Sequence, residues 1–213
     1  MIILGKRQET IPSYPTLSEY EEGTIIKIPE SSRLVEFYLS KHNYEPGLNG
    51  NGRTLLIRKD IYDLRAWDSD NQNYYATSDI DGWFNGSYKN LLGIQVDPVK
   101  FYYAESGSVI EADILERFVF TSSATELGLS GSFPVIGATL PVASAIRAAM
   151  YNGGNYMYWT RTPVGDTTTQ SVYMQADANN SGNANCRLSL GSRPCFCLYE
   201  DTLIDPDTME VIP

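Results

Sequence analysis

The sequence is poor in the residues that build metal sites and most hydrolytic active sites. Its 213 residues include one histidine, His42, and three cysteines, Cys186, Cys195 and Cys197. A zinc site needs several Cys or His ligands, and a triad hydrolase needs a histidine base beside a nucleophile. No CxxC pair and no nucleophile-elbow motif is present. The composition therefore predicts no triad enzyme, and we expect no metal ion and no cofactor.

The chain also lacks an excess of basic residues and any long apolar run. Its 16 Lys and Arg oppose 26 Asp and Glu, which gives a net charge of −10. This charge repels phosphate backbones and anionic membrane surfaces. No apolar run approaches the roughly 20 residues that span a bilayer, and "MIILGKRQ" has too few apolar residues for a signal peptide. We expect no nucleic-acid partner, no membrane insertion and no Sec-type export signal.

The abundant residues favour β and irregular structure in one domain. The chain has 15 Tyr and 17 Gly beside many Asn and Ser, a mixture poor in helix formers. Residues 1–20 carry Pro12 and Pro15 without a hydrophobic period, so they are expected to form an arm that contacts other subunits. Residues 21–213 are expected to form the domain. Because Cys195 and Cys197 lie two apart, they share a strand face, and we expect reduced, buried thiols.

Two segments have the signals of helices. In 78–93, Ser78 can cap the first turn, apolar residues recur every three or four positions, and Gly93 suits the C-terminus. In 140–154, Pro141 suits a first turn and Gly153 an end. Apolar, β-branched and aromatic runs predict strands or extended segments elsewhere; they lie at 24–28, 34–39, 54–67, 101–107, 116–123, 155–163, 171–177 and 186–198, with a short terminal strand after residue 205.

Three stretches together resemble an uncharacterised domain family of gut bacteria, phages and prophages. They are "EGTIIKI…EFYLSKHNYEPGLNGNGRTLLIRKDIYD", "SDIDGWFNGSYKNLL" and the pair "YWTRTP…GSRPCF", and the resemblance covers about Glu21 to Leu198. That family is similar to the C-type lectin-like fold in its formylglycine-generating-enzyme variety, also used by variable proteins of diversity-generating retroelements. The resemblance implies an α+β domain with two helices flanking small antiparallel sheets, and long loops that carry a ligand-facing surface.

The resemblance also implies where a ligand binds. In the variable proteins the diversified residues lie between a Trp-containing strand and the closing Arg-Pro phrase, which corresponds here to Tyr156–Arg187. The segment "QADANNSGNANCR" within this range mixes small polar residues, and the neighbouring tyrosines offer rigid contact area, as in antibody paratopes. We expect a ligand to contact residues of this range, namely Tyr156, Tyr158, Tyr173, Gln175, Asp177, Asn179, Asn180, Asn183, Asn185 and Arg187.

The phrases on either side of this segment are expected to be scaffold. Arginine can donate several hydrogen bonds to backbone carbonyls, proline restricts φ, and glycine permits a special backbone angle. The expected scaffold residues are Trp159, Arg161, Pro163, Gly191, Arg193 and Pro194.

Three functions remain open at this point. The first is a noncatalytic phage or prophage adhesion protein that binds a host-surface protein or glycan and that a retroelement diversifies. The second is an architectural capsid or tail protein whose arm, with its apolar "MIIL" tip, contacts other virion subunits. The third is a formylglycine-generating-type enzyme. That oxidase branch binds copper through paired Cys, whereas Cys195 and Cys197 are spaced as strand neighbours.

The sequence lacks the phrases of calcium-dependent sugar-binding lectins. Calcium-binding lectins use Glu-Pro-Asn and Trp-Asn-Asp phrases, but "EPG" at 45–47 lies in the wrong region and no Trp-Asn-Asp occurs. We therefore expect no calcium site. The expected location is a phage particle, or a prophage product assembled in the bacterial cytoplasm. A homo-oligomer such as a trimer suits a virion protein.

Overall fold

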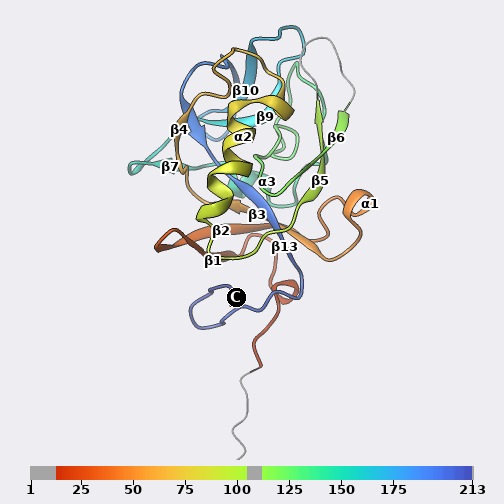
Figure 1. Cartoon of the computed structure of the whole chain (residues 1–213), viewed down its shortest axis with the longest axis vertical. Coiled ribbons are helices and arrows are strands. Elements are labelled where there is room, and N and C mark those ends of the chain that lie inside the picture. Colours follow the sequence, from red (N-terminus) through yellow and green to blue (C-terminus); the bar gives the residue numbers. More distant parts are fainter. Residues whose placement is uncertain (1–12, 105–111, 213) are drawn as a thin grey trace, which may run out of the picture.

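A four-stranded antiparallel sheet forms one half of the molecule. The structure is a computed structural model that describes residues 13–104 and 112–212. The strands are β1 (Ile25–Glu30), β2 (Arg33–Lys41), β3 (Arg53–Arg58) and β13 (Cys195–Tyr199), in the order β1-β2-β3-β13. The strands predicted at 24–28 and 34–39 are confirmed as β1 and β2. In Figure 1 this sheet occupies the lower half of the domain.

A five-stranded sheet occupies the upper half of the domain in Figure 1. Its order is β11-β10-β9-β12-β4, with a single parallel pairing between β12 and β9. The bounds are Asp63–Arg65 for β4, Tyr158–Pro163 for β9, Gln170–Met174 for β10, Ser181–Asn185 for β11 and Leu190–Ser192 for β12. Two separate hairpins pair β5 (Val99–Ala104) with β6 (Ala112–Arg117), and β7 (Met150–Tyr151) with β8 (Gly154–Asn155). Strands dominate a mixed α+β architecture.

The helix predicted at 78–93 is confirmed in its first half. Helix α2 spans Asp79–Gly86, and the Ser78 side chain accepts a hydrogen bond from the Asp81 backbone N–H, as expected of a cap. A 3₁₀ turn, η3 (Tyr88–Leu91), follows α2. The remaining short elements are η1 (Leu17–Glu19), α1 (Pro46–Asn49) and η2 (Tyr75–Thr77). In Figure 1, α2 lies in front of the sheets and spans the space between them.

The helix predicted at 140–154 is wrong beyond its first turn. Only α3 (Ala143–Ile146) is helical, and the chain then enters the β7–β8 hairpin. Arginine and tyrosine side chains occupy the carbonyls that a longer helix would use: Ile146 O accepts from Arg193 at 2.7 Å, and Arg147 O accepts from the Tyr158 hydroxyl at 2.9 Å. Tertiary hydrogen bonds therefore replace the i→i−4 ladder. The expected pair of flanking helices reduces to α2 alone.

Aromatic side chains join the two sheets in one core. Trp67 and Trp159 meet edge to face with ring centroids 5.8 Å apart, and Phe101 stacks on Phe120 at 4.4 Å. A smaller apolar cluster lies on the opposite side of β9 and includes Tyr158. All six residues of β9 are buried because both faces of this strand are covered. The strand that contains "YWTRTP" is thus fully enclosed.

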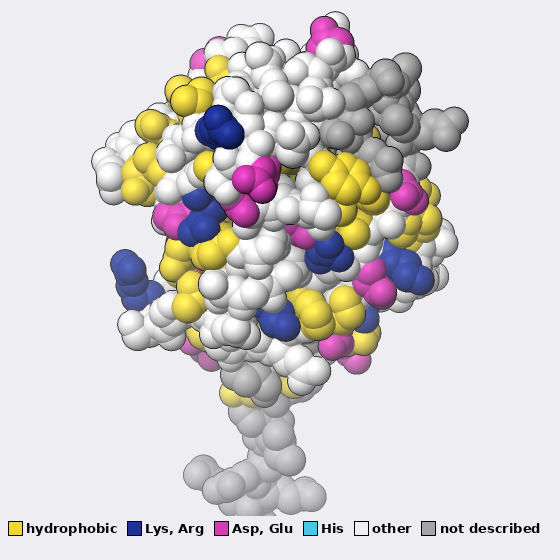
Figure 2. All heavy atoms as spheres, turned by 45° about the horizontal axis from the view of Figure 1, so that its top comes forward, with side chains coloured by type: hydrophobic (Ala, Val, Ile, Leu, Met, Phe, Trp, Pro, Cys, Tyr) yellow, Lys and Arg dark blue, Asp and Glu magenta, His cyan; other side chains and the backbone are white. Residues whose placement is uncertain are grey.

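Part of the expected N-terminal arm lies against the domain. Leu17 is fully buried, its backbone N–H donates to Thr202 O at 2.8 Å, and Thr16 forms a bridge with Leu203. The rest of the expected arm, residues 1–12, lies outside the described residues. No helix among the described residues is long and apolar enough to cross a membrane. Figure 2 shows acidic and basic side chains interspersed on the face in view, without one dominant charge patch.

Candidate ligand-binding surface

Arg161 of β9 is fully buried, and every branch of its guanidinium has a partner. Two nitrogens donate to the two carboxylate oxygens of Glu126, each at 2.6 Å. Further bonds reach Thr121 O at 2.8 Å and Tyr102 O at 3.0 Å. The Tyr44 hydroxyl donates to Glu126 at 2.6 Å. Burial raises the pKa of Tyr44 well above its usual value. This network joins β9 to segments far apart in the sequence, which makes Arg161 a structural tie.

Arg193, after β12, forms a second buried tie. Its guanidinium donates to the carbonyls of Arg58, Lys59 and Ile146 at 2.7, 3.0 and 2.7 Å. It also donates to the Tyr158 hydroxyl at 2.8 Å and lies over that ring, 4.9 Å from its centroid. Arg193 therefore joins the end of β3 and the end of α3 through main-chain acceptors, and the start of β9 through the Tyr158 hydroxyl.

The other expected scaffold residues are buried as well, but glycine acts differently from the prediction. The six residues expected as scaffold, Trp159, Arg161, Pro163, Gly191, Arg193 and Pro194, are all buried. Gly191 has no positive φ, so a special backbone angle is the wrong explanation for it. A Cβ at this position would lie 2.7 Å from Ile61 Cδ1 and 2.9 Å from Met157 O. The glycine is required because backbone and side chain approach it closely.

Residues 175–187, between the two scaffold phrases, include the turn and second strand of a β-hairpin, although their composition is typical of a loop. Residues 181–185 form β11, which pairs with β10 in antiparallel register from Met174↔Ser181 to Gln170↔Asn185. β11 is the edge strand of the five-stranded sheet. Asn183 and Asn185 are exposed, whereas Ala184 between them is buried. One face of this strand is therefore presented to solvent by a rigid sheet.

The turn of this hairpin satisfies its own polar groups. Asp177 accepts hydrogen bonds from the backbone N–H groups of Asn179 and Asn180 at 3.0 and 3.2 Å, and from the Asn180 amide at 2.9 Å. These hydrogen bonds lower the pKa of Asp177. Gln175 Nε2 donates to Ser181 O at 3.0 Å across the turn. The side chains at 175–180 thus stabilise the turn, and their remaining polar atoms face solvent.

The opposite end of β11 has a different set of polar groups. Asn185 accepts from the Arg187 backbone N–H at 3.0 Å, and exposed Arg187 donates from Nε to Ser69 O at 2.9 Å. Within the described part of the chain, the Asn183 amide has no hydrogen-bond partner and is free for a ligand. The register places Asn183 in the middle of this five-residue strand, which is about 16 Å long, and Asn185 at the end away from the turn.

The three expected tyrosines occupy three different environments. Tyr158 is fully buried against Arg193, so its assignment to an exposed binding surface is wrong. Tyr173 is half-buried, with its ring over Gly182 and edge-on to Trp159. Tyr156 is half-buried beside Tyr151, with ring centroids 5.9 Å apart. We call Tyr156, Tyr173 and the exposed residues of 175–187 the hairpin surface.

The comparison with known protein families assigns this chain to one of them. Residues 51–200, well over half of the chain, match the model of a family described as a domain of unknown function, DUF6273. The chain belongs to the DUF6273 family. The matched range contains both arginine ties and the whole hairpin surface. No curated protein and no solved structure matches the chain.

The cysteines of this DUF6273 domain are packed as core residues. All three are buried and unbridged. Burial raises the pKa of Cys186 and of Cys195 to about 12, and raises that of Cys197 well above its usual value. None is therefore a thiolate near neutral pH, and none is accessible to a substrate. Among residues 13–104 and 112–212, no three His, Cys, Asp or Glu side chains are grouped as metal ligands.

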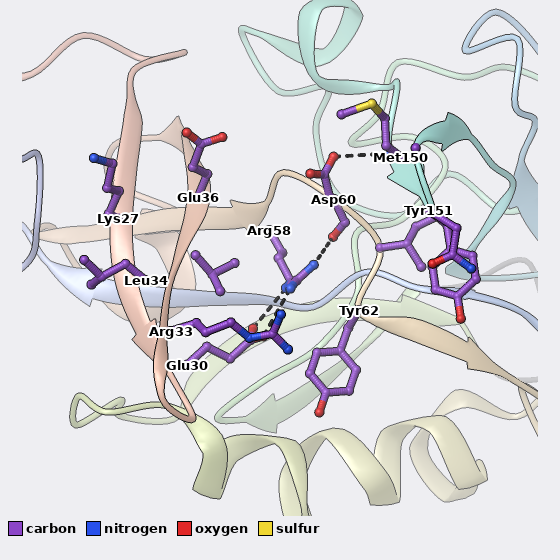
Figure 3. Close-up of a pocket in the computed structure, with 14 residues that line it drawn as sticks. Lys27, Glu30, Arg33, Leu34, Glu36, Arg58, Asp60, Tyr62, Met150 and Tyr151 are labelled. Carbon is purple, nitrogen blue, oxygen red and sulfur yellow. Dashed lines mark hydrogen bonds and ion pairs between the residues drawn. The ribbon is translucent and has the colours of Figure 1, made fainter.

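A groove on this DUF6273 domain was not foreseen from the sequence. It has a volume of about 870 Å³ and lies between the β1–β2 hairpin, residues 58–62 and the β7–β8 hairpin (Figure 3). The segments that line it are far apart in the sequence, and no motif links them. Among its lining residues, Leu34 and Met150 are apolar side chains that are unusually exposed, at 48% and 43% accessible.

Proposed function

We propose that this chain is a noncatalytic binding domain with a C-type lectin-like fold, carried by a phage or prophage particle. Its hairpin surface recognises a host-surface protein or glycan. The observation that supports this best is the contrast between buried arginine ties and an exposed, polar edge strand between them. The assignment to a phage particle rests on the family resemblance, as does diversification of this range by a retroelement.

The arrangement suits recognition because the residues that stabilise the fold are different from the residues that are exposed to a ligand. Arg161 and Arg193 use main-chain acceptors and a buried carboxylate, so they do not depend on the identity of exposed side chains. Asn183, Asn185 and Arg187 project from a strand that these ties keep in place. Preorganised polar groups lose little conformational entropy on binding. Buried thiols with raised pKa values disfavour the formylglycine-generating alternative.

The architectural alternative has an observation of its own. An apolar groove of about 420 Å³ is lined by Leu92, Ile94, Leu198, Val211 and Ile212, among others. Exposed Tyr14 and Leu203 belong to the two terminal segments of the described chain. If the domain only decorates a particle, these residues would carry its contacts and the hairpin surface would be dispensable.

A cell-binding assay separates the two functions. Fluorescently labelled domain is incubated with a panel of gut bacterial strains, and the bound fraction is compared with that of a triple variant, Asn183→Ala, Asn185→Ala and Arg187→Ala. We expect the variant to lose binding while its melting temperature stays unchanged. Binding that survives in the folded variant would exclude the hairpin surface. Absence of cell binding by the wild type, with incorporation into particles, would favour the architectural function.

A further inference from the structure

The floor of the groove in Figure 3 is a closed polar network. Arg58 donates to both oxygens of Glu30 at 3.0 and 3.1 Å and to Asp60 O at 2.7 Å. The Tyr88 hydroxyl donates to Glu30 at 2.5 Å. Glu30 is 94% buried, since its accessible fraction is 6%. This network fixes the shape of the floor and leaves Arg58 and Glu30 no need of a ligand.

The rim of the groove carries two cations without partners. Among the described residues, the side chains of Lys27 and Arg33 make no ion pair and no hydrogen bond, whereas Glu30 and Glu36 are paired with Arg58 and Lys59. Figure 3 shows Arg33 extending from β2 toward Arg58. The register places Arg33 opposite Glu30 and Lys27 opposite Glu36, so Arg33 is the free cation beside the groove floor. On a chain of net charge −10, this free cation is a site for an anionic group.

The wall opposite Arg33 adds a free acceptor. Asp60 Oδ1 accepts from the Met150 backbone N–H at 3.3 Å, and within the described part of the chain its other oxygen has no donor. Asn152, also lining the groove, is exposed with a free amide. A ligand that fills the groove must therefore offer an anionic group to one wall and hydrogen-bond donors to the other.

Apolar surface lies between these polar groups. Leu34 and Met150 come from opposite sides of the groove, and the half-buried Tyr62 and Tyr151 also line it (Figure 3). Small-ligand sites combine apolar and aromatic walls with a few placed polar groups, in volumes of about 300–1,000 Å³. The groove has this composition and size.

The main chain around the groove is already occupied. The carbonyls of Arg58 and Lys59 accept from Arg193, and the N–H groups of Ile61 and Tyr62 donate to Met150 O and Ser192 O at 3.0 and 2.9 Å. An extended peptide that binds by adding a strand needs free main-chain groups. This wall offers few of them, so recognition here depends on side chains.

We propose that this groove binds an acidic saccharide. Its carboxylate would lie on Arg33, its hydroxyls would donate to Asp60, and the apolar face of a sugar ring would pack on Tyr62 or Tyr151. A carboxylated sugar supplies the anion, the donors and the apolar face in one molecule, whereas an acidic peptide side chain supplies no donor for Asp60. The groove shares no residue with the hairpin surface, so this site stands even if the hairpin surface binds nothing.

Isothermal titration of the full chain tests the site with defined probes. The probes are a hexuronic-acid trisaccharide, its carboxyl-reduced neutral counterpart, a trisaccharide ending in a sialic acid, and a triglutamate peptide. At least one acidic saccharide should bind, and Arg33→Gln should weaken it about tenfold or more, as expected for a lost charged hydrogen bond. The reduced sugar should bind about tenfold more weakly than its acid.

A matched variant removes a cation outside both surfaces. Lys100→Gln removes an exposed cation of β5 and should leave the affinity for the acidic saccharide unchanged. The proposal is overturned if neither acidic saccharide binds at about 5 mM, if folded Arg33→Gln binds as well as the wild type, or if triglutamate binds equally. If cell binding fails while saccharide binding is retained, the proposal for the hairpin surface is wrong. In the opposite case, the proposal for the groove is wrong.

Discussion

The two arginine ties and the hairpin surface use similar polar chemistry in opposite ways. Arg161 and Arg193 are buried, and their donors end on carboxylate or main-chain acceptors contributed by distant segments. The polar groups of 175–187 bond mainly to neighbours in the same hairpin, as Asp177 does with Asn179 and Asn180. Loss of an arginine that joins distant segments should destabilise the whole domain, whereas loss of a hydrogen bond within the hairpin should affect one turn. Substitutions of the exposed residues of 175–187 should therefore cost the fold little.

The largest effect should come from breaking the Arg161 tie. Glu126→Gln keeps the shape of the side chain but leaves the buried guanidinium without a counter-charge. We expect it to lower the free energy of unfolding by about 3–5 kcal/mol, measured by urea denaturation. Glu36→Gln, at the partly exposed pair with Lys59, is the matched control and should cost less than about 1 kcal/mol. Equal costs would contradict the distinction between buried and exposed pairs.

Asp81 is intermediate between the buried and exposed ion pairs, because it is a buried carboxylate with a partly exposed partner, Arg117. Burial raises the pKa of Asp81 to about 6, against the opposing effect of Arg117 and Asn85. A raised carboxyl pKa makes the folded state more stable when protonated, so this contribution is present below pH 3.8 and is lost as pH rises through 6. The stability of the wild type relative to Asp81→Asn should fall by up to about 3 kcal/mol over this range.

Chemical denaturation at pH 4 and pH 7 checks this prediction. The difference between wild type and Asp81→Asn isolates this carboxyl from the other titrating groups. A difference that stays constant, or that grows with pH, would show that Arg117 outweighs burial.

Gly191, in the "GSRPCF" phrase, tests the scaffold through packing instead of charge. In Gly191→Ala the new Cβ would meet Ile61 and the carbonyl of Met157 at less than 3.0 Å, and a backbone atom cannot move aside cheaply. The expected cost is about 1–3 kcal/mol in thermal or urea unfolding. Gly154→Ala, where no atom lies within 4 Å, should change stability by less than about 0.5 kcal/mol. A neutral Gly191→Ala would remove close approach as the reason for this glycine.

The smallest structural effect should be confined to the hairpin turn. Asp177→Ala removes the acceptor of the Asn179 and Asn180 amides. Hydrogen exchange of these two amides should quicken, while the amides of β9 stay protected. Asp166→Ala, at another exposed acid, should leave both sets unchanged. Faster exchange throughout β9 would mean that the turn supports the sheet.

Local signals were enough to predict part of this fold. The cap at Ser78 and the apolar runs of β1 and β2 depend on neighbouring residues, so α2 and these strands could be predicted. The helix at 140–154 failed because Arg193 and Tyr158 occupy carbonyls that it needs, and both lie outside the segment. Propensity alone does not report such tertiary competition.

The candidate site was predictable in its position more than in its form. The polar composition of 175–187 located an exposed surface, but Asn, Gly and Ser have low β-propensity, so β11 was missed. Its strand form comes from pairing with β10. Tyr158 was misplaced because both faces of β9 are covered, which alternation along one strand does not show. The groove was missed because three remote segments build it.

The most direct test of the account compares the two regions in one experiment. The free energy of unfolding is measured by urea denaturation for the wild type, for Glu126→Gln, and for the triple variant Asn183→Ala, Asn185→Ala and Arg187→Ala. We expect the triple variant to stay within about 1 kcal/mol of the wild type while Glu126→Gln loses about 3–5 kcal/mol. A triple variant destabilised as much as Glu126→Gln would show that the hairpin surface is part of the frame, which contradicts the account.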